Sequence, residues 1–189
     1  MSIDDFKRYA RVLHKLTVDF ALVVPDDRWD FAPEPPGQPV RVKAPYRIGH
    51  GFAPFCKQLR HVICVRGVYN DALATKRVDW TRKHEHYTGS LARMELITAL
   101  DEKLRDLLAI LGTVNTDASI DWNGTPFTFA LFTWEFVQHE AIHHGQWSVY
   151  ASLAGFDTPA SWRASWGYEK FASLLCAPSR RVRELHHSS

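Results

Sequence analysis

Apolar residues recur at intervals of three and four along four long stretches of the chain, a spacing that is typical of amphipathic helices. The expected helices cover residues 3–24, 48–74, 90–112 and 129–154, and a shorter helix covers residues 166–176. Turn-forming residues follow three of them: Pro25 the first, Gly112 the third and Gly155 the fourth. The pattern predicts an all-α fold, a four-helix bundle with a short additional C-terminal helix.

The connections between the expected helices carry their own signals. Residues 31–45 are rich in proline, which predicts an ordered surface loop. Ser90 is expected to cap the third helix. In residues 113–126, the Asn123-Gly124 pair indicates a tight turn flanked by two short strands. We expect one domain over residues 1–176, followed by a solvated tail at 177–189.

Composition limits the classes of function. The 189 residues include 23 basic and 21 acidic ones, a formal net charge of +2, and this near-balance argues against nucleic-acid binding. No stretch approaches the roughly 18 apolar residues of a membrane span, and the N-terminus lacks the apolar core of a signal peptide. Three cysteines without C-x-x-C spacing are expected to be reduced thiols. These features predict a soluble cytoplasmic protein that acts on a small molecule.

Residues 138–146, Q-H-E-A-I-H-H-G-Q, hold the main candidate site. His139 and His143 lie one helical turn apart, with Cβ atoms about 5–6 Å from each other, so both imidazoles can reach one metal ion. Such a pair alone is more often structural or solvent-facing. His61 changes this view, because it lies on a second apolar helix and supplies a third ligand across the bundle. The sequence predicts a divalent metal site, with zinc as the first candidate and nickel or iron as alternatives.

Other histidines and one cysteine are not assigned to the metal. His144 points about 100° away from His143 around the helix, so we expect it at the surface or as a hydrogen-bonding neighbour of the site. Cys64 is expected to pack as a small hydrophobic residue. The remaining histidines are expected to be solvated: His14, His50, His84, His86, His186 and His187.

Several features together resemble the DinB-like superfamily of helical-bundle metalloproteins, over nearly the whole chain. They are Pro25-Asp26 after the first helix, His61 with Arg66 five residues later, the S-L-A-R-M-E-L-I-T-A-L-D-E-K-L helix, the D-W-N-G-T-P-F turn region, and His139, His143, Gly145 and Gln146. The chain departs from the family's pattern at His144, where arginine is frequent, and in its proline-rich insertion. The resemblance implies a bound zinc or nickel ion, frequent homodimers, and reactions that transfer or isomerise with a low-molecular-weight thiol.

A site of three neutral imidazoles leaves at least one coordination position open. A metal ion there stabilises a thiolate or lowers the pKa of water towards about 7. We therefore predict a metal-dependent thiol S-transferase or hydrolase. Glu140 is a candidate general base, while Arg66, Tyr150 and Gln146 are candidates for orienting the substrate.

Two other functions fit the same residues. H-E-A-I-H matches the H-E-x-x-H motif of zinc peptidases, with Glu140 as the general base. That enzyme needs a third ligand downstream, for which Glu169 and Glu184 are the acidic candidates. The other function is a non-catalytic, metal-stabilised ligand-binding module, in which the histidines tie two helices together.

Overall fold

The structure is a computed structural model that describes residues 2–33 and 53–166. Its elements, in chain order, are α1 (Ile3–Val23), η1 (Asp26–Arg28), α2 (Phe55–Thr75), η2 (Lys83–His86), α3 (Arg93–Ile110), β1 (Ile120–Trp122), β2 (Thr125–Phe127), α4 (Phe129–Ala154) and α5 (Ala160–Trp166). The chain divides into two compact units after Thr158, and α5 lies in the second. The predicted all-α fold is confirmed, and the prediction of a single domain to residue 176 stays a prediction.

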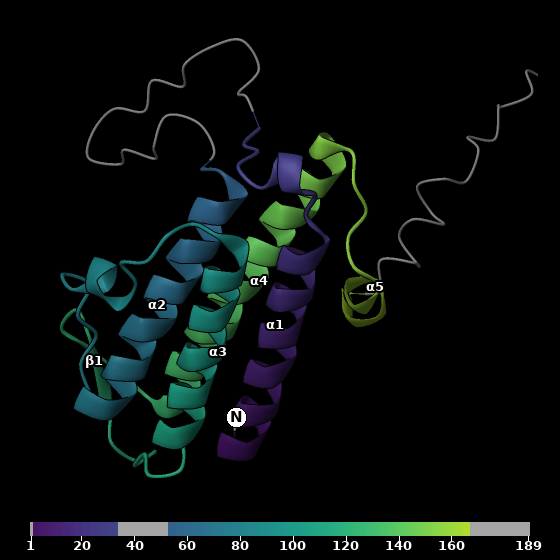
Figure 1. The fold of residues 1–189 in the computed structure, drawn as a ribbon. Coiled ribbons are helices and arrows are strands. Elements are labelled where there is room, and N and C mark those ends of the chain that lie inside the picture. The colour runs from purple at the N-terminus through teal and green to yellow at the C-terminus, as the bar shows by residue number, and fades with distance from the viewer. Residues whose placement is uncertain (1, 34–52, 167–189) are drawn as a thin grey trace, which may run out of the picture. The chain divides into compact units, whose positions relative to one another are not determined.

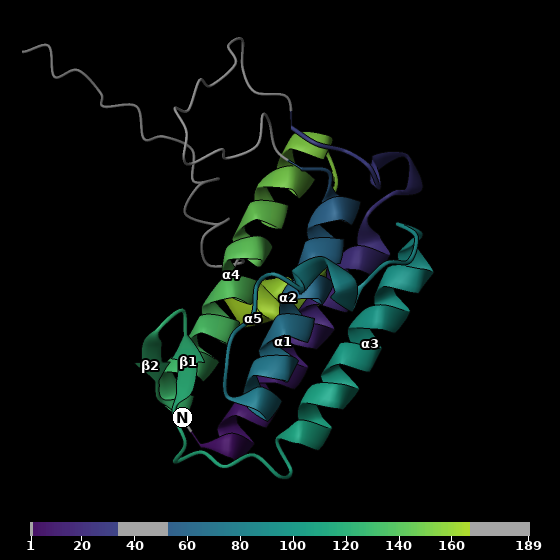
Figure 2. The ribbon, with the colours of Figure 1, turned by 90° about the vertical axis from the view of Figure 1, so that its left-hand side faces the viewer.

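The four long helices of the first unit form a bundle in which α1 and α2 each contact both α3 and α4. In Figure 1, α1 and α4 run upward while α2 and α3 both run downward. Because α2 and α3 are parallel, the connection at residues 76–92 has to return along the bundle. It contains η2, which packs against α2 (Figure 2).

Capping residues begin helices α1 and α4 and end helix α4. The Ser2 hydroxyl accepts a hydrogen bond from the Asp5 N–H at 3.1 Å, and Thr128 accepts one from Leu131 at 3.2 Å. Helix α4 ends at Gly155, which has a φ of 78° and closes the helix in the left-handed conformation. The predicted helices at 3–24 and 129–154 are confirmed.

Two helix starts lie later than the sequence predicts. Helix α2 begins at Phe55 directly after Pro54, because the residue that precedes a proline disfavours helical backbone. The expected start near Ile48 falls in residues 34–52, outside the described residues, as does most of the expected proline-rich loop. Helix α3 begins at Arg93 with Ala92 as its N-cap. Ser90 instead accepts a hydrogen bond from the Ala92 N–H at 3.1 Å, a turn that precedes the helix.

A short helix follows the bundle in the second unit. Helix α5 covers Ala160–Trp166, which the sequence did not predict to be helical before Trp166, and the predicted helix at 166–176 lies outside the described residues except for Trp166. Pro159 precedes it directly and favours a helix start there, because its fixed φ suits the first turn. The Trp162 N–H donates to the Pro159 carbonyl at 2.9 Å. Residues 167–189, including the predicted tail, lie outside the described residues.

The two predicted strands are confirmed as a hairpin. Strands β1 and β2 pair antiparallel, with Ile120 opposite Phe127. The turn residues Asn123 and Gly124 have φ values of 52° and 87°. A two-residue hairpin turn of type I′ requires positive φ at both of these positions.

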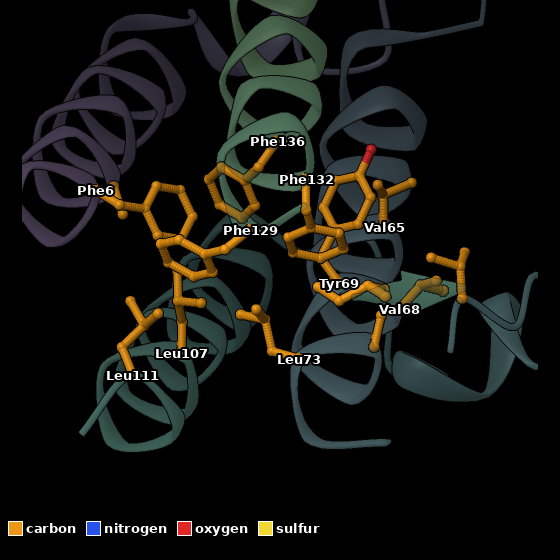
Figure 3. Close-up of a cluster of buried hydrophobic side chains, with 14 of the residues drawn as sticks. Phe6, Val65, Val68, Tyr69, Leu73, Leu107, Leu111, Phe129, Phe132 and Phe136 are labelled. Carbon is orange, nitrogen blue, oxygen red and sulfur yellow. The ribbon is translucent and has the colours of Figure 1, made fainter. Parts of the chain in front are cut away.

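Aromatic side chains fill the end of the bundle beside the hairpin. Phe6 of α1 packs edge-to-face against Phe129 and Phe136 of α4, with ring centroids 6.0 and 5.3 Å away. Tyr69 of α2 contacts Phe132 of α4 at 5.5 Å. Figure 3 shows these rings meeting between α1, α2 and α4. Burial of such large apolar rings is the main force that holds the helices together here.

A second aromatic cluster fills the opposite end of the bundle. Phe20 of α1, Phe55 of α2 and Trp147 of α4 are all within 6 Å of one another by ring centroid. The two clusters leave a middle layer in which polar side chains meet. Within the described residues, no helix is both long and apolar enough to cross a membrane.

Helix α2 and the connection that contains η2 approach closely at Gly67. A Cβ atom there would lie 2.3–2.5 Å from His86, so His86 is packed against α2 and the prediction that it is solvated is wrong.

Gly67→Ala is expected to lower the free energy of unfolding by about 1–3 kcal/mol, measured by urea unfolding, because the new methyl group would clash with His86. Gly145→Ala is the control, since nothing lies within 4 Å of that Cβ, and it should raise stability by about 0.5–1 kcal/mol. Equal effects of the two substitutions on the free energy of unfolding would contradict the close contact between Gly67 and His86.

Candidate metal centre

Three histidines from two helices converge in the middle layer of the bundle. His61 lies on α2, and His139 and His143 lie one turn apart on α4. One ligand atom from each lies within 4.8 Å of those of the other two. The Nε2 atoms of His61 and His139 are 3.1 Å apart. The structure therefore brings the three residues predicted from the sequence together.

The aromatic clusters flank this group along α4. The Tyr69 ring lies 6.2 Å from the His139 ring, and the Trp147 ring lies 5.9 Å from the His143 ring. Packing on both sides limits the rotation of the two imidazoles, because well-packed side chains have few alternative rotamers. The histidines are thus held in place by the bundle core.

Burial keeps the three imidazoles neutral. It lowers the pKa of His61 to about 3, and the positive charge of Lys83 lowers it further. Burial also lowers the pKa of His139 to about 4, and it lowers the pKa of His143. A neutral imidazole has a free lone pair, which is the form that binds a metal ion.

The donor set fits a divalent transition metal. Three nitrogen ligands with an open fourth position are the pattern of catalytic zinc sites, and zinc–nitrogen bonds of about 2.0–2.1 Å place two tetrahedral ligands roughly 3.4 Å apart. The 3.1 Å separation of the His61 and His139 nitrogens is close to that value. The buried Nδ1 atom of His143 has no hydrogen-bond partner among the described residues. A bound metal ion would supply a polar partner for the His143 side chain.

Glu140 does not face this group as a free carboxylate. Its two oxygens accept hydrogen bonds from the Nε and Nη2 atoms of Arg66, at 2.7 and 3.0 Å, and both side chains are almost fully buried. Burial alone raises the pKa of the Glu140 carboxyl, but the Arg66 guanidinium more than offsets it and holds the pKa at about 2. Two candidate catalytic residues therefore form one ion pair between α2 and α4.

A hydrogen-bond network extends from this ion pair to α1. The Thr17 hydroxyl donates to Glu140 at 3.3 Å and lies 2.8 Å from the His144 Nε2 atom. Because that hydroxyl proton points at Glu140, His144 must donate its own Nε2 proton to Thr17. His144 is 2% exposed, so the expectation of a surface position is wrong, while its expected hydrogen-bonding role holds.

His14 continues the network to α3. Arginine only donates, so Arg66 Nη1, 3.1 Å from His14 Nδ1, leaves the imidazole proton on Nε2. That atom lies 2.9 Å from the Asp101 carboxylate of α3. The prediction that His14 is solvated is wrong. His14, which is partly buried, and Thr17, which is buried, lie three residues apart on α1, and such a polar pair beside an apolar face is the signal that could have revealed the network.

The other candidates are not members of the three-histidine ligand group. The Tyr150 hydroxyl donates to the Ala53 carbonyl at 3.0 Å and accepts from Gln58 at 2.6 Å, and burial raises its pKa to about 12. Gln146 is exposed. Cys64 is buried and does not join the metal-ligand group, in line with the predicted packing role. Glu169 and Glu184 lie outside the described residues.

Comparison with known proteins supports the fold. No family model matches the chain, and no curated protein sequence does either. The crystal structure of a DinB-like protein from Bacillus subtilis matches with a TM-score of 0.57, over 82% of this chain and 94% of that one. The chain has a DinB-like fold. The two sequences are 14% identical, so the likeness concerns the DinB-like architecture and not the chemistry at its centre.

Proposed function

We propose that this DinB-like protein is a metal-dependent enzyme of the thiol S-transferase or hydrolase type. Its ligands are His61, His139 and His143, and its substrate is a small molecule. The observation that carries the proposal is the convergence of three neutral imidazoles from α2 and α4, with ligand atoms within 4.8 Å. Zinc is the first candidate, and nickel or iron also accept imidazole ligands. When bound, such an ion supplies a Lewis acid that activates a thiol or water.

The chain's own residues hold this site in place. The Arg66–Glu140 ion pair ties α2 to α4 close to the ligands, since Glu140 directly follows His139. The aromatic clusters pack against the ligands of α4, with the Tyr69 ring beside His139 and the Trp147 ring beside His143. In this proposal Arg66 and Glu140 position the ligands and do not touch the substrate. A homodimer, as the family resemblance implies, stays a prediction.

The zinc peptidase is the weaker candidate. Its mechanism needs a glutamate carboxylate that is free to take a proton from water at the metal. Both oxygens of Glu140 accept hydrogen bonds from Arg66, and the low pKa of this carboxyl makes it a poor base. This geometry favours a reaction in which the nucleophile is activated without Glu140.

An assay with and without metal tests the proposed activity. We would incubate the zinc-loaded protein with a panel of small thiols and an electrophilic reporter, and with ester and peptide substrates. Thiol transfer or ester hydrolysis should fall roughly a hundredfold or more after chelation and recover when zinc is restored. His61→Ala should stay inactive under both conditions, whereas His84→Ala, an exposed histidine of η2, serves as the control and should behave as the wild type.

The other outcomes separate the alternatives. Cleavage of peptides alone would favour the peptidase. Stoichiometric zinc without turnover of any substrate would contradict an enzyme and favour the non-catalytic module. A reaction rate that is independent of zinc would contradict the proposed use of the three histidines.

A further inference from the structure

The side of the bundle where α2 packs against α3 has a hollow that the metal centre does not use. Both ribbon views show these two helices side by side (Figures 1 and 2). The hollow has a volume of about 340 Å³, and its polar lining consists of Asn70 and Asp71 of α2 with Lys103 and Asp106 of α3. The metal ligands lie on α2 and α4. The α2–α3 hollow is therefore formed by a different pair of helices.

Asn70 is a buried polar residue of the hollow with one atom unsatisfied. The residue is 4% exposed, and its Nδ2 atom donates to the Lys103 carbonyl at 2.9 Å, so the side chain reaches from α2 to α3. Its Oδ1 atom is buried and has no hydrogen-bond partner among the described residues. Exchanging the amide oxygen and nitrogen would only set one acceptor against the carbonyl acceptor. Buried amide oxygens nearly always accept a hydrogen bond, so this atom points to a donor on a ligand.

The charged side chains of the hollow leave it negative. Asp106 forms no ion pair with any described residue. The Asp71 Oδ2 atom lies 3.7 Å from the His86 Nε2 atom, which is too far for a hydrogen bond. Burial lowers the pKa of His86, so its imidazole is neutral near pH 7 and does not offset Asp71. Lys103 brings one positive charge against two carboxylates, so one negative charge is left over.

The arrangement of these groups favours an organic cation over a metal ion. Among the described residues, the three histidines are the one group of three or more candidate ligands whose atoms lie within 4.8 Å of one another. Asp71, Asp106 and His86 are therefore too widely spaced to share one metal ion. An ammonium or guanidinium group has several N–H donors that point in different directions. Ala109 and Ile110 also line the hollow and offer an apolar surface to the stem of such a molecule.

We propose that the α2–α3 hollow binds a small organic monocation, which carries a primary ammonium or guanidinium group on an aliphatic stem. One N–H of the cation donates to Asn70 Oδ1, and its charge is balanced by Asp71 and Asp106. The side chain of Lys103, a single charge on a flexible stem, moves to let the cation reach the buried oxygen. This site uses none of the three histidines, so it is separate from the proposed metal-dependent activity.

Titration of the full chain with butylammonium, followed by proton–nitrogen NMR, tests this proposal. The reporter is the side-chain amide of Asn70. Butanol is the neutral probe of similar shape, and tetramethylammonium is a cation without N–H groups. Asp71→Asn and Asp106→Asn each remove one charge from the hollow. Asp30→Asn is the matched control, because it makes the same change in net charge at an exposed residue after η1. All titrations are made at low salt, where attraction between charges is strongest.

Butylammonium should shift the Asn70 side-chain signals to saturation, whereas butanol and tetramethylammonium should not. Asp71→Asn and Asp106→Asn should each weaken butylammonium binding roughly fivefold, while Asp30→Asn should stay within about twofold of the wild type. The proposal would be overturned by the absence of a saturable shift with butylammonium, by an equal response to tetramethylammonium, or by unchanged binding in both hollow variants. Zinc content and metal-dependent turnover are measured separately, so failure here would leave the proposed metal site standing.

Discussion

Glu140→Gln is expected to lower the free energy of unfolding by about 3–5 kcal/mol, because it leaves the Arg66 guanidinium buried without its counter-charge. The amide keeps the shape of the carboxylate but lacks its charge and one of its acceptor oxygens. Urea unfolding followed by circular dichroism measures the change. If Glu140 were instead a solvent-accessible general base, the variant would lose activity and keep the stability of the wild type.

Two further variants separate the ion pair from other effects at this position. Glu135→Gln alters a carboxylate on the same helix that forms no ion pair with a described residue, so its effect should stay within about 0.5 kcal/mol. The double replacement Arg66→Met with Glu140→Leu should be less destabilising than either single change, because no buried charge is left unpaired. Additive losses in the double variant would show that the two side chains act independently.

Zinc is expected to stabilise the wild-type protein and not His61→Ala. The three ligands join α2 to α4, and the unfolded chain lacks this arrangement, so metal binding shifts the equilibrium towards the folded state. At a free zinc concentration about 100 times Kd, the gain should be about 2.7 kcal/mol in urea unfolding. His84→Ala should keep the full gain. A similar zinc effect in His61→Ala would mean that the ion binds elsewhere.

Local sequence signals predicted much of the fold. Gly155 marked the end of helix α4, and the bounds of this helix were predicted correctly. The Asn123-Gly124 pair predicted the hairpin for the same reason, since few residues adopt the backbone that the turn requires. The start of α2 was missed because apolar spacing continues on both sides of Pro54, and the spacing alone does not register the backbone limits that proline imposes.

The three metal ligands were found because they lie on helices whose apolar faces indicate a shared core. The polar network was missed, since its members come from four helices and only their packing shows which side chains meet. His14 and Thr17 of α1 reach Arg66 and Glu140 across more than 50 residues of sequence.

Elemental analysis of the untagged protein tests whether His61, His139 and His143 hold a metal ion. We expect about one zinc or other divalent transition metal ion per chain in the wild type and in His84→Ala, and near-complete loss in both His61→Ala and His139→Ala. Circular dichroism would confirm that the two variants remain helical. Metal content that is unchanged in His61→Ala, or negligible in a wild-type protein supplied with these metals, would contradict a metal site shared between α2 and α4.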